Sequence, residues 1–125
     1  MRKLLLPALA VLLLAGSASA AGLDDTDRLQ IQAAMRHYVE DNLVDGKYPL
    51  YDALNGGFRH LTFKVLHPDV VQMSGFYLSC LDFVDEKGAA YDIDFMVAKG
   101  DHGYRVVQDI IHAVDGRKRA YHHER

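Results

Sequence analysis

The stretch that decides the fold is Ala90-Tyr91-Asp92-Ile93-Asp94-Phe95-Met96-Val97-Ala98. In an extended chain its apolar residues Tyr91, Ile93, Phe95 and Val97 share one side, and Asp92, Asp94 and Met96 share the other. This period of two is typical of a strand with one packed face and one polar face. The stretch therefore predicts an antiparallel sheet that is covered on one side only.

Further segments of the same character lie on both sides of this stretch. They are residues 48–52, residues 58–67 with Leu61, Phe63 and Val65 on one side, residues 70–83 with a bend at Ser74-Gly75, and residues 104–114. Turn residues separate them, including Asn55-Gly56-Gly57, and Pro68 ends the second because proline restricts the residue before it. We expect a meander of four or five antiparallel strands.

Residues 25–44 have the pattern of a helix. Ile31, Ala34, Met35 and Tyr38 recur at spacings of three and four, and Leu43 extends the apolar stripe. Asp24, Asp25 and Asp27 favour a helix start, and Gly46 suits a left-handed stop. Because the sheet needs cover, the predicted fold is α+β: one N-terminal amphipathic helix packed on a curved four- to five-stranded antiparallel meander sheet.

This order of elements resembles the cystatin-like and nuclear-transport-factor-2-like group of folds, and the cystatin-like version is the closer one. The segments 77–83, 91–95 and 111–116 also resemble small exported bacterial proteins of no assigned activity. Inhibitory cystatins carry a Gln-x-Val-x-Gly hairpin. The nearest stretch here, Gln72-Met73-Ser74-Gly75, is one residue short and lacks the valine, so it does not predict protease inhibition.

Residues 1–20 have the three parts of a cleavable signal peptide. Arg2 and Lys3 are basic, residues 4–15 are almost all apolar, and Ala18 and Ala20 suit signal peptidase. The apolar run is about twelve residues long, whereas a membrane-spanning helix needs about twenty. We therefore expect a single domain of residues 21–125 that works in the periplasm or outside the cell, without a membrane anchor.

Charge and cysteine content narrow the partners. The chain has 14 basic and 17 acidic groups, so its net charge is −3, and cleavage removes Arg2 and Lys3. A chain this acidic is a poor match for nucleic acid or for anionic lipid. Its single cysteine, Cys80, excludes an internal disulfide and is expected to pack as a small apolar side chain.

The candidate site is a group of acidic residues on the polar face of the sheet. If Phe83 faces Tyr91 across a hairpin, Asp82 lies opposite Asp92 and Cys80 opposite Asp94, and directly opposed like charges destabilise a sheet. The last strand brings either His112 or Asp109 near Asp92, depending on its register. Asp82, Asp92, Asp94 and His112 are therefore the candidate catalytic residues.

Four interpretations of this cluster stay open. It can be a solvated polar face, a surface that recognises a ligand or partner, a metal site in which hard oxygen ligands favour calcium, or a pair of groups for acid–base catalysis. The sequence has no EF-hand loop and no close His/Cys spacing for zinc. No metal-ligating set, cofactor-binding residue or cofactor is therefore assigned.

The remaining histidines carry less information. His37, His60, His67 and His102 are expected to be surface or packed residues, and His122 and His123 form an adjacent pair in the tail. Fingerprints of nucleotide-binding loops and nucleophile elbows are absent from the sequence. We expect an exported, non-enzymatic binding module for a peptide, a protein or a small ligand. The alternatives are a small enzyme that uses the Asp/His cluster, or a metal-binding accessory protein.

Overall fold

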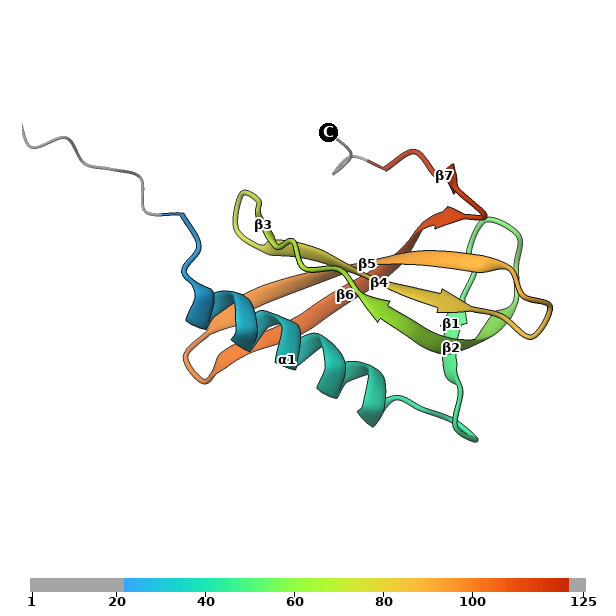
Figure 1. The fold of residues 1–125 in the computed structure, drawn as a ribbon, viewed down its shortest axis with the longest axis horizontal. Helices are drawn as coiled ribbons and strands as arrows, with labels where there is room; N and C mark the ends of the chain where they lie inside the picture. The colour runs from blue at the N-terminus through green and yellow to red at the C-terminus, as the bar shows by residue number, and fades with distance from the viewer. Residues whose placement is uncertain (1–21, 122–125) are drawn as a thin grey trace, which may run out of the picture.

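The computed structural model describes residues 22–121, so the predicted signal peptide and the pair His122 and His123 lie outside the described residues. The elements are α1 (Asp25–Asp41), β1 (Tyr48–Tyr51), β2 (Phe58–Leu66), β3 (Val71–Gln72), β4 (Tyr77–Val84), β5 (Ala90–Gly100), β6 (Gly103–Val114) and β7 (Arg117–Lys118). One helix lies along a curled antiparallel sheet (Figure 1). The predicted α+β class and the N-terminal helix are confirmed.

The prediction of four or five strands is wrong, because the described chain forms seven. Their order is β1-β2-β4-β5-β6-β7, and β3 pairs with β4. The predicted strand 70–83 is two strands, since the chain reverses at Ser74-Gly75, where the Met73 N–H donates to the Phe76 carbonyl at 2.8 Å. The last short strand, β7, follows a turn at Asp115-Gly116 and pairs with the end of β6.

Strands β2 and β3 share one edge of β4. β2 pairs with β4 from Leu81 to Val84, and β3 pairs with Leu78 and Tyr77. Between them the chain leaves the ladder at His67-Pro68-Asp69, although the His67 N–H still donates to the Cys80 carbonyl at 3.1 Å. The break predicted at Pro68 is therefore an interruption within a single sheet edge, and it leaves His67 beside β4.

Helix α1 covers the apolar face of the sheet. The Asp24 side chain caps its first turn by accepting from the Asp27 N–H at 2.7 Å. Ile31, Met35 and Val39 are buried against β5 and β6. With them the core contains Tyr48, Leu50, Leu61, Leu81, Phe83, Tyr91, Ile93, Phe95, Val97, Val106 and Ile111.

The helix is shorter than predicted. It ends at Asp41, and the side chain of Asn42 donates to the Tyr38 carbonyl at 2.7 Å, which satisfies an acceptor of the last turn. Gly46 does not end the helix; it belongs to a turn closed by hydrogen bonds between Val44 and Lys47. Leu43 consequently leaves the apolar stripe and is 44% exposed.

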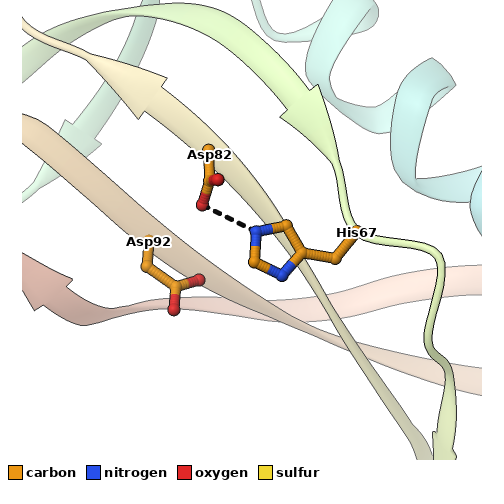
Figure 2. Close-up of side chains that lie close together, drawn as sticks. All are labelled: His67, Asp82 and Asp92. Atoms are coloured by element: carbon orange, nitrogen blue, oxygen red, sulfur yellow. Dashed lines mark ion pairs between the residues drawn. The ribbon is translucent and has the colours of Figure 1, made fainter. Parts of the chain in front are cut away.

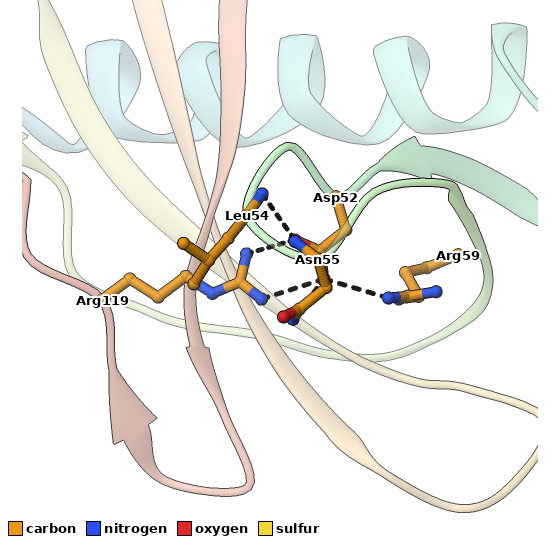
Figure 3. Close-up of polar contacts among 5 residues, drawn as sticks. All are labelled: Asp52, Leu54, Asn55, Arg59 and Arg119. Atoms are coloured by element: carbon orange, nitrogen blue, oxygen red, sulfur yellow. Dashed lines mark hydrogen bonds and ion pairs between the residues drawn. The ribbon is translucent and has the colours of Figure 1, made fainter.

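Side-chain contacts hold the two ends of the curled sheet together. The Tyr48 hydroxyl of β1 donates to the carboxylate of Asp109 on β6. Beyond β1, the carboxylate of Asp52 is 1% exposed and accepts two hydrogen bonds from Arg119, at 2.8 and 2.9 Å, and one from Arg59 at 3.3 Å (Figure 3). The sheet thus closes partway into a half-barrel, with the core between sheet and helix.

Candidate functional site

The register of β4 and β5 gathers the aspartates as the sequence predicted. Asp82 pairs with Asp92, Cys80 with Asp94, and Phe83 with Tyr91. Since Phe83 and Tyr91 belong to the core, the alternating side chains Asp82 and Asp92 lie on the opposite face of the sheet. The predicted pairing is confirmed, and it places two carboxylates directly across from each other.

A bulge in β6 adds His112 to this group. Asp92 pairs with Ala113 and Ile93 with Ile111, so His112 is an extra residue between the two pairs. Its Nδ1 lies 3.5 Å from Asp92 Oδ2 and 3.4 Å from Asp94 Oδ2. Of the two registers left open by the sequence, the structure has the one that forms a carboxylate–histidine cluster.

Asp109, the residue of the other register, lies elsewhere. It is opposite Phe95, a core residue, and accepts the hydrogen bond from Tyr48. The expectation that Asp109 joins the acidic group in the alternative register is therefore not met.

His67 belongs to the site, although its sequence context predicted only a surface or packed residue. Phe63 pairs with Phe83 and Val65 with Asp82, so β2 has a bulge between Phe63 and Val65. The predicted grouping of Leu61, Phe63 and Val65 on one face is wrong for this reason: Leu61 is buried, whereas Val65 is 52% exposed. The bulge reverses the alternation and turns His67 toward the polar face.

His67 contacts two residues of β4. Its Nε2 lies 2.8 Å from Asp82 Oδ1, and its Nδ1 lies 3.5 Å from Cys80 Sγ. Figure 2 shows the ring between the interrupted edge and β4, with the Asp92 carboxylate close by on β5. The site therefore draws on three parts of the sheet: the end of β2, β4 and β5, with His112 on β6 beside them.

The cluster is half withdrawn from water. The side chains of His67 and Asp82 are 34% and 40% exposed, that of Asp92 is 29% exposed, and that of Asp94 is 3% exposed. His67, Asp92 and Asp94 border an open hollow of about 380 Å³. Asp69 from the segment before β3, Val71 of β3 and Lys118 of β7 also line it. A solvated polar face is thus the wrong description for Asp94, which neighbouring segments cover.

Burial and mutual repulsion set the electrostatics of the cluster. Burial, and next the charge of Asp94, raise the pKa of Asp92, while His112 and His67 partly offset the rise. Asp92 Oδ1 is buried and has no hydrogen-bond partner among residues 22–121. Carboxylates that are close together and partly shielded from water favour the binding of a cation, because buried charges are normally paired or bound to a metal.

Cys80, His67 and Asp82 have the order of contacts found in a cysteine nucleophile with its base and orienting carboxylate. The electrostatics oppose that role. Burial raises the pKa of the Cys80 thiol well above its ordinary value, and the charges of Asp92 and Asp94 raise it further. Because the thiolate is the nucleophile, this environment suppresses thiol attack.

Two overlapping sets of side chains have the spacing of metal ligands. One ligand atom from each of His67, Asp82 and Asp92 lies within 4.8 Å of the others, and the same holds for Cys80, Asp92 and Asp94. Donors bound to one zinc ion at about 2.1 Å are roughly 3 to 3.5 Å apart. Small side-chain rotations therefore bring either set to coordination distance.

The other histidines of the described chain lie outside the cluster. His37 is on the exposed side of the helix, 3.6 Å from Glu40, and His60 and His102 are exposed. These three are surface residues, one of the two environments that the sequence led us to expect. Among residues 22–121, α1 falls short of the length and apolar character needed to cross a bilayer.

No protein-family model, curated protein or solved structure matches this chain.

Proposed function

We propose that this protein is an exported binding module whose ligand is a divalent metal ion, held by His67, Asp82 and Asp92. The single observation that carries the proposal is the convergence of their ligand atoms within 4.8 Å, from the end of β2, from β4 and from β5. An imidazole and two carboxylates form a donor set that binds Zn²⁺ and other divalent first-row transition metals.

The cost of the cluster without an ion supports the proposal. Asp82 and Asp92 are directly opposed, and Asp94 is buried two residues farther along β5. Opposed like charges destabilise a sheet, and buried charges are normally paired or bound to a metal. A divalent ion offsets this repulsion and also supplies a partner for Asp92 Oδ1.

The imidazole changes the expected metal. The acidic residues alone favoured calcium, which takes oxygen ligands. His67 adds a nitrogen donor, which suits zinc, cobalt or nickel better than calcium. We therefore propose a transition-metal ion, with Zn²⁺ as the ion to test and Ca²⁺ as the comparison ion in the binding measurements.

The proposal predicts a thermal shift that depends on His67. Zn²⁺ at about a hundredfold above its dissociation constant should raise the melting temperature of the purified protein by about 10 °C or more. His67→Gln and Asp82→Asn should weaken binding by at least about tenfold in titration calorimetry.

Two controls make the test specific. His60→Gln changes an exposed histidine on β2, the strand that precedes His67, and should leave the shift intact. His122→Gln/His123→Gln removes the adjacent tail pair and should also keep it. A melting temperature insensitive to millimolar Zn²⁺, or a shift that survives His67→Gln and vanishes with the tail pair, overturns the proposal.

Acid–base catalysis by Asp82, Asp92, Asp94 and His112 is the alternative proposal. Its support is the raised pKa of Asp92, since a carboxyl group that titrates nearer neutrality serves as a general acid or base. If zinc, cobalt, nickel and calcium all fail to bind, this alternative becomes the better account of the cluster.

The cellular location and the fold relationship are also proposals. The pattern of residues 1–20 supports export to the periplasm or outside, and the mass of the protein recovered from a periplasmic fraction should correspond to a chain that begins at Ala21. A mass that retains residues 1–20 contradicts export with cleavage. One helix followed by a curled antiparallel sheet supports the cystatin-like relationship.

A further inference from the structure

The polar face offers a second set of donors one step along the same pair of strands. Cys80 and Asp94 face each other two residues away from the Asp82–Asp92 pair on β4 and β5. Residues two apart on a strand point to the same face and lie about 6.5 to 7 Å apart along it. The ligand atoms of Cys80, Asp92 and Asp94 lie within 4.8 Å of one another. Asp92 therefore belongs to both sets.

The position of Asp92 suits a shared ligand. A carboxylate has two oxygens and can bind one ion with each. Asp92 Oδ2 is 3.5 Å from His112, whereas Asp92 Oδ1 is buried and has no hydrogen-bond partner in the described chain. Asp82 is its cross-strand partner on β4, and Asp94 lies two residues along β5, so the two approach Asp92 from different directions.

The charges of the cluster match two ions better than one. Asp82, Asp92 and Asp94 bring three carboxylates together on neighbouring strands, whereas one divalent ion carries two positive charges. The side chain of Asp94 is only 3% exposed, so water screens its charge poorly. An ion held by His67, Asp82 and Asp92 is not bound by Asp94, whose Oδ2 lies 3.4 Å from His112 Nδ1.

We propose that the cluster holds two transition-metal ions bridged by the Asp92 carboxylate, the second bound by Cys80 and Asp94; this rests on the proposed metal-binding function. The donors of the second ion are one thiolate and two carboxylates, which suit Zn²⁺ or Co²⁺. Ca²⁺ binds oxygen ligands and would not use the thiolate. Binding of the second ion forms a sulfur–metal bond and releases the thiol proton of Cys80 to the buffer.

Cobalt titration of the purified protein tests the second site, because Co²⁺ reports both the number of ions and the sulfur ligand. Calorimetry should give two Co²⁺ per chain, and absorbance should show a near-ultraviolet thiolate-to-cobalt band. Asp82→Asn should remove one ion and keep the band. Cys80→Ser and Asp94→Asn should each remove one ion, and Cys80→Ser should remove the band. Asp92→Asn should weaken both sites by at least about tenfold.

The outcomes separate the two proposals. Two ions with a band that Cys80→Ser abolishes support the bridged pair. One ion without the band overturns the second site and leaves the proposed function standing, and no ion overturns both. One ion whose band Cys80→Ser abolishes contradicts the bridged arrangement. The His122→Gln/His123→Gln chain serves as background, and circular dichroism checks each fold; if Cys80→Ser fails to fold, the ion count of Asp94→Asn decides.

Discussion

At the scale of single residues, Asp92 is the carboxylate that experiences most of the like-charge repulsion in the site. It faces Asp82 across the strand pair, has Asp94 as its near neighbour along β5, and has a raised pKa because of burial and of that neighbour. Residues chosen for stability alone do not place three carboxylates together on a half-buried face. A functional site tolerates such a cost, since binding and catalysis often require locally unfavourable groups.

Asp92→Asn should therefore separate stability from binding. Without metal, in the presence of a chelator, the asparagine removes the repulsion, and the free energy of unfolding should be unchanged or higher by about 0.5 to 1 kcal/mol. Urea unfolding at pH 8 measures this. Asp101→Asn, at an exposed turn position, should change stability by less than about 0.5 kcal/mol. A loss of more than about 1 kcal/mol in Asp92→Asn indicates a structural charge instead of a ligand.

At the scale of elements, two bulges aim the histidines. β2 gains a residue between Phe63 and Val65, and β6 gains one at His112. Without the first bulge, simple alternation puts His67 on the side of Leu61, toward the core. In the sequence the period of two continues through Val65, and neither glycine nor proline marks the bulge between Phe63 and Val65. This is why the sequence did not predict His67 as a site residue. His112 was predicted because one of the two registers left open for the last strand brings it near Asp92.

The hairpin between β4 and β5 shows the opposite case. Asp85-Glu86-Lys87-Gly88 is a recognisable turn, and the apolar faces of both strands must point to the helix. The register in which Phe83 faces Tyr91 meets both conditions and brings Asp82 to Asp92 and Cys80 to Asp94, and the structure has this register. A recognisable turn and one buried face were thus a good guide to the pairing of these two neighbouring strands.

At the scale of the whole molecule, the curl depends on contacts between the first strand and the last part of the chain. Asp52, just after β1, binds Arg119, just after β7, through both carboxylate oxygens. The Arg119 side chain is 11% exposed, so this ion pair is largely shielded from water. Arg119 and Asn55 hydrogen bonds hold the pKa of Asp52 well below its ordinary value despite burial. An ion pair on the surface contributes little to stability. A buried pair such as Asp52–Arg119 is costly to break, because the remaining partner is then a buried charge without a counter-charge.

Asp52→Asn should lower the free energy of unfolding by about 3 kcal/mol at pH 7, because Arg119 then lacks a counter-charge. The folded pKa of Asp52 is below the unfolded value, so its contribution is complete above about pH 4 and is lost as the pH falls below it. Urea unfolding from pH 7 to pH 3 should show the gap between wild type and variant narrowing at the acid end. Asp101→Asn should run parallel to wild type, and a gap that does not depend on pH contradicts the assignment.

The sequence by itself determined the helix, the polar and apolar faces of β4 and β5, and the pairing of Asp82 with Asp92, because periodicity, turn residues and one buried face are local or nearest-neighbour properties. The tertiary structure alone decided that His67 joins the site, that Asp94 is covered, and that Asp52 binds Arg119. Each of these depends on a bulge or on contacts between distant segments. Such features follow from how the whole sheet curls around its core, and a pattern of residue types along the chain does not contain them.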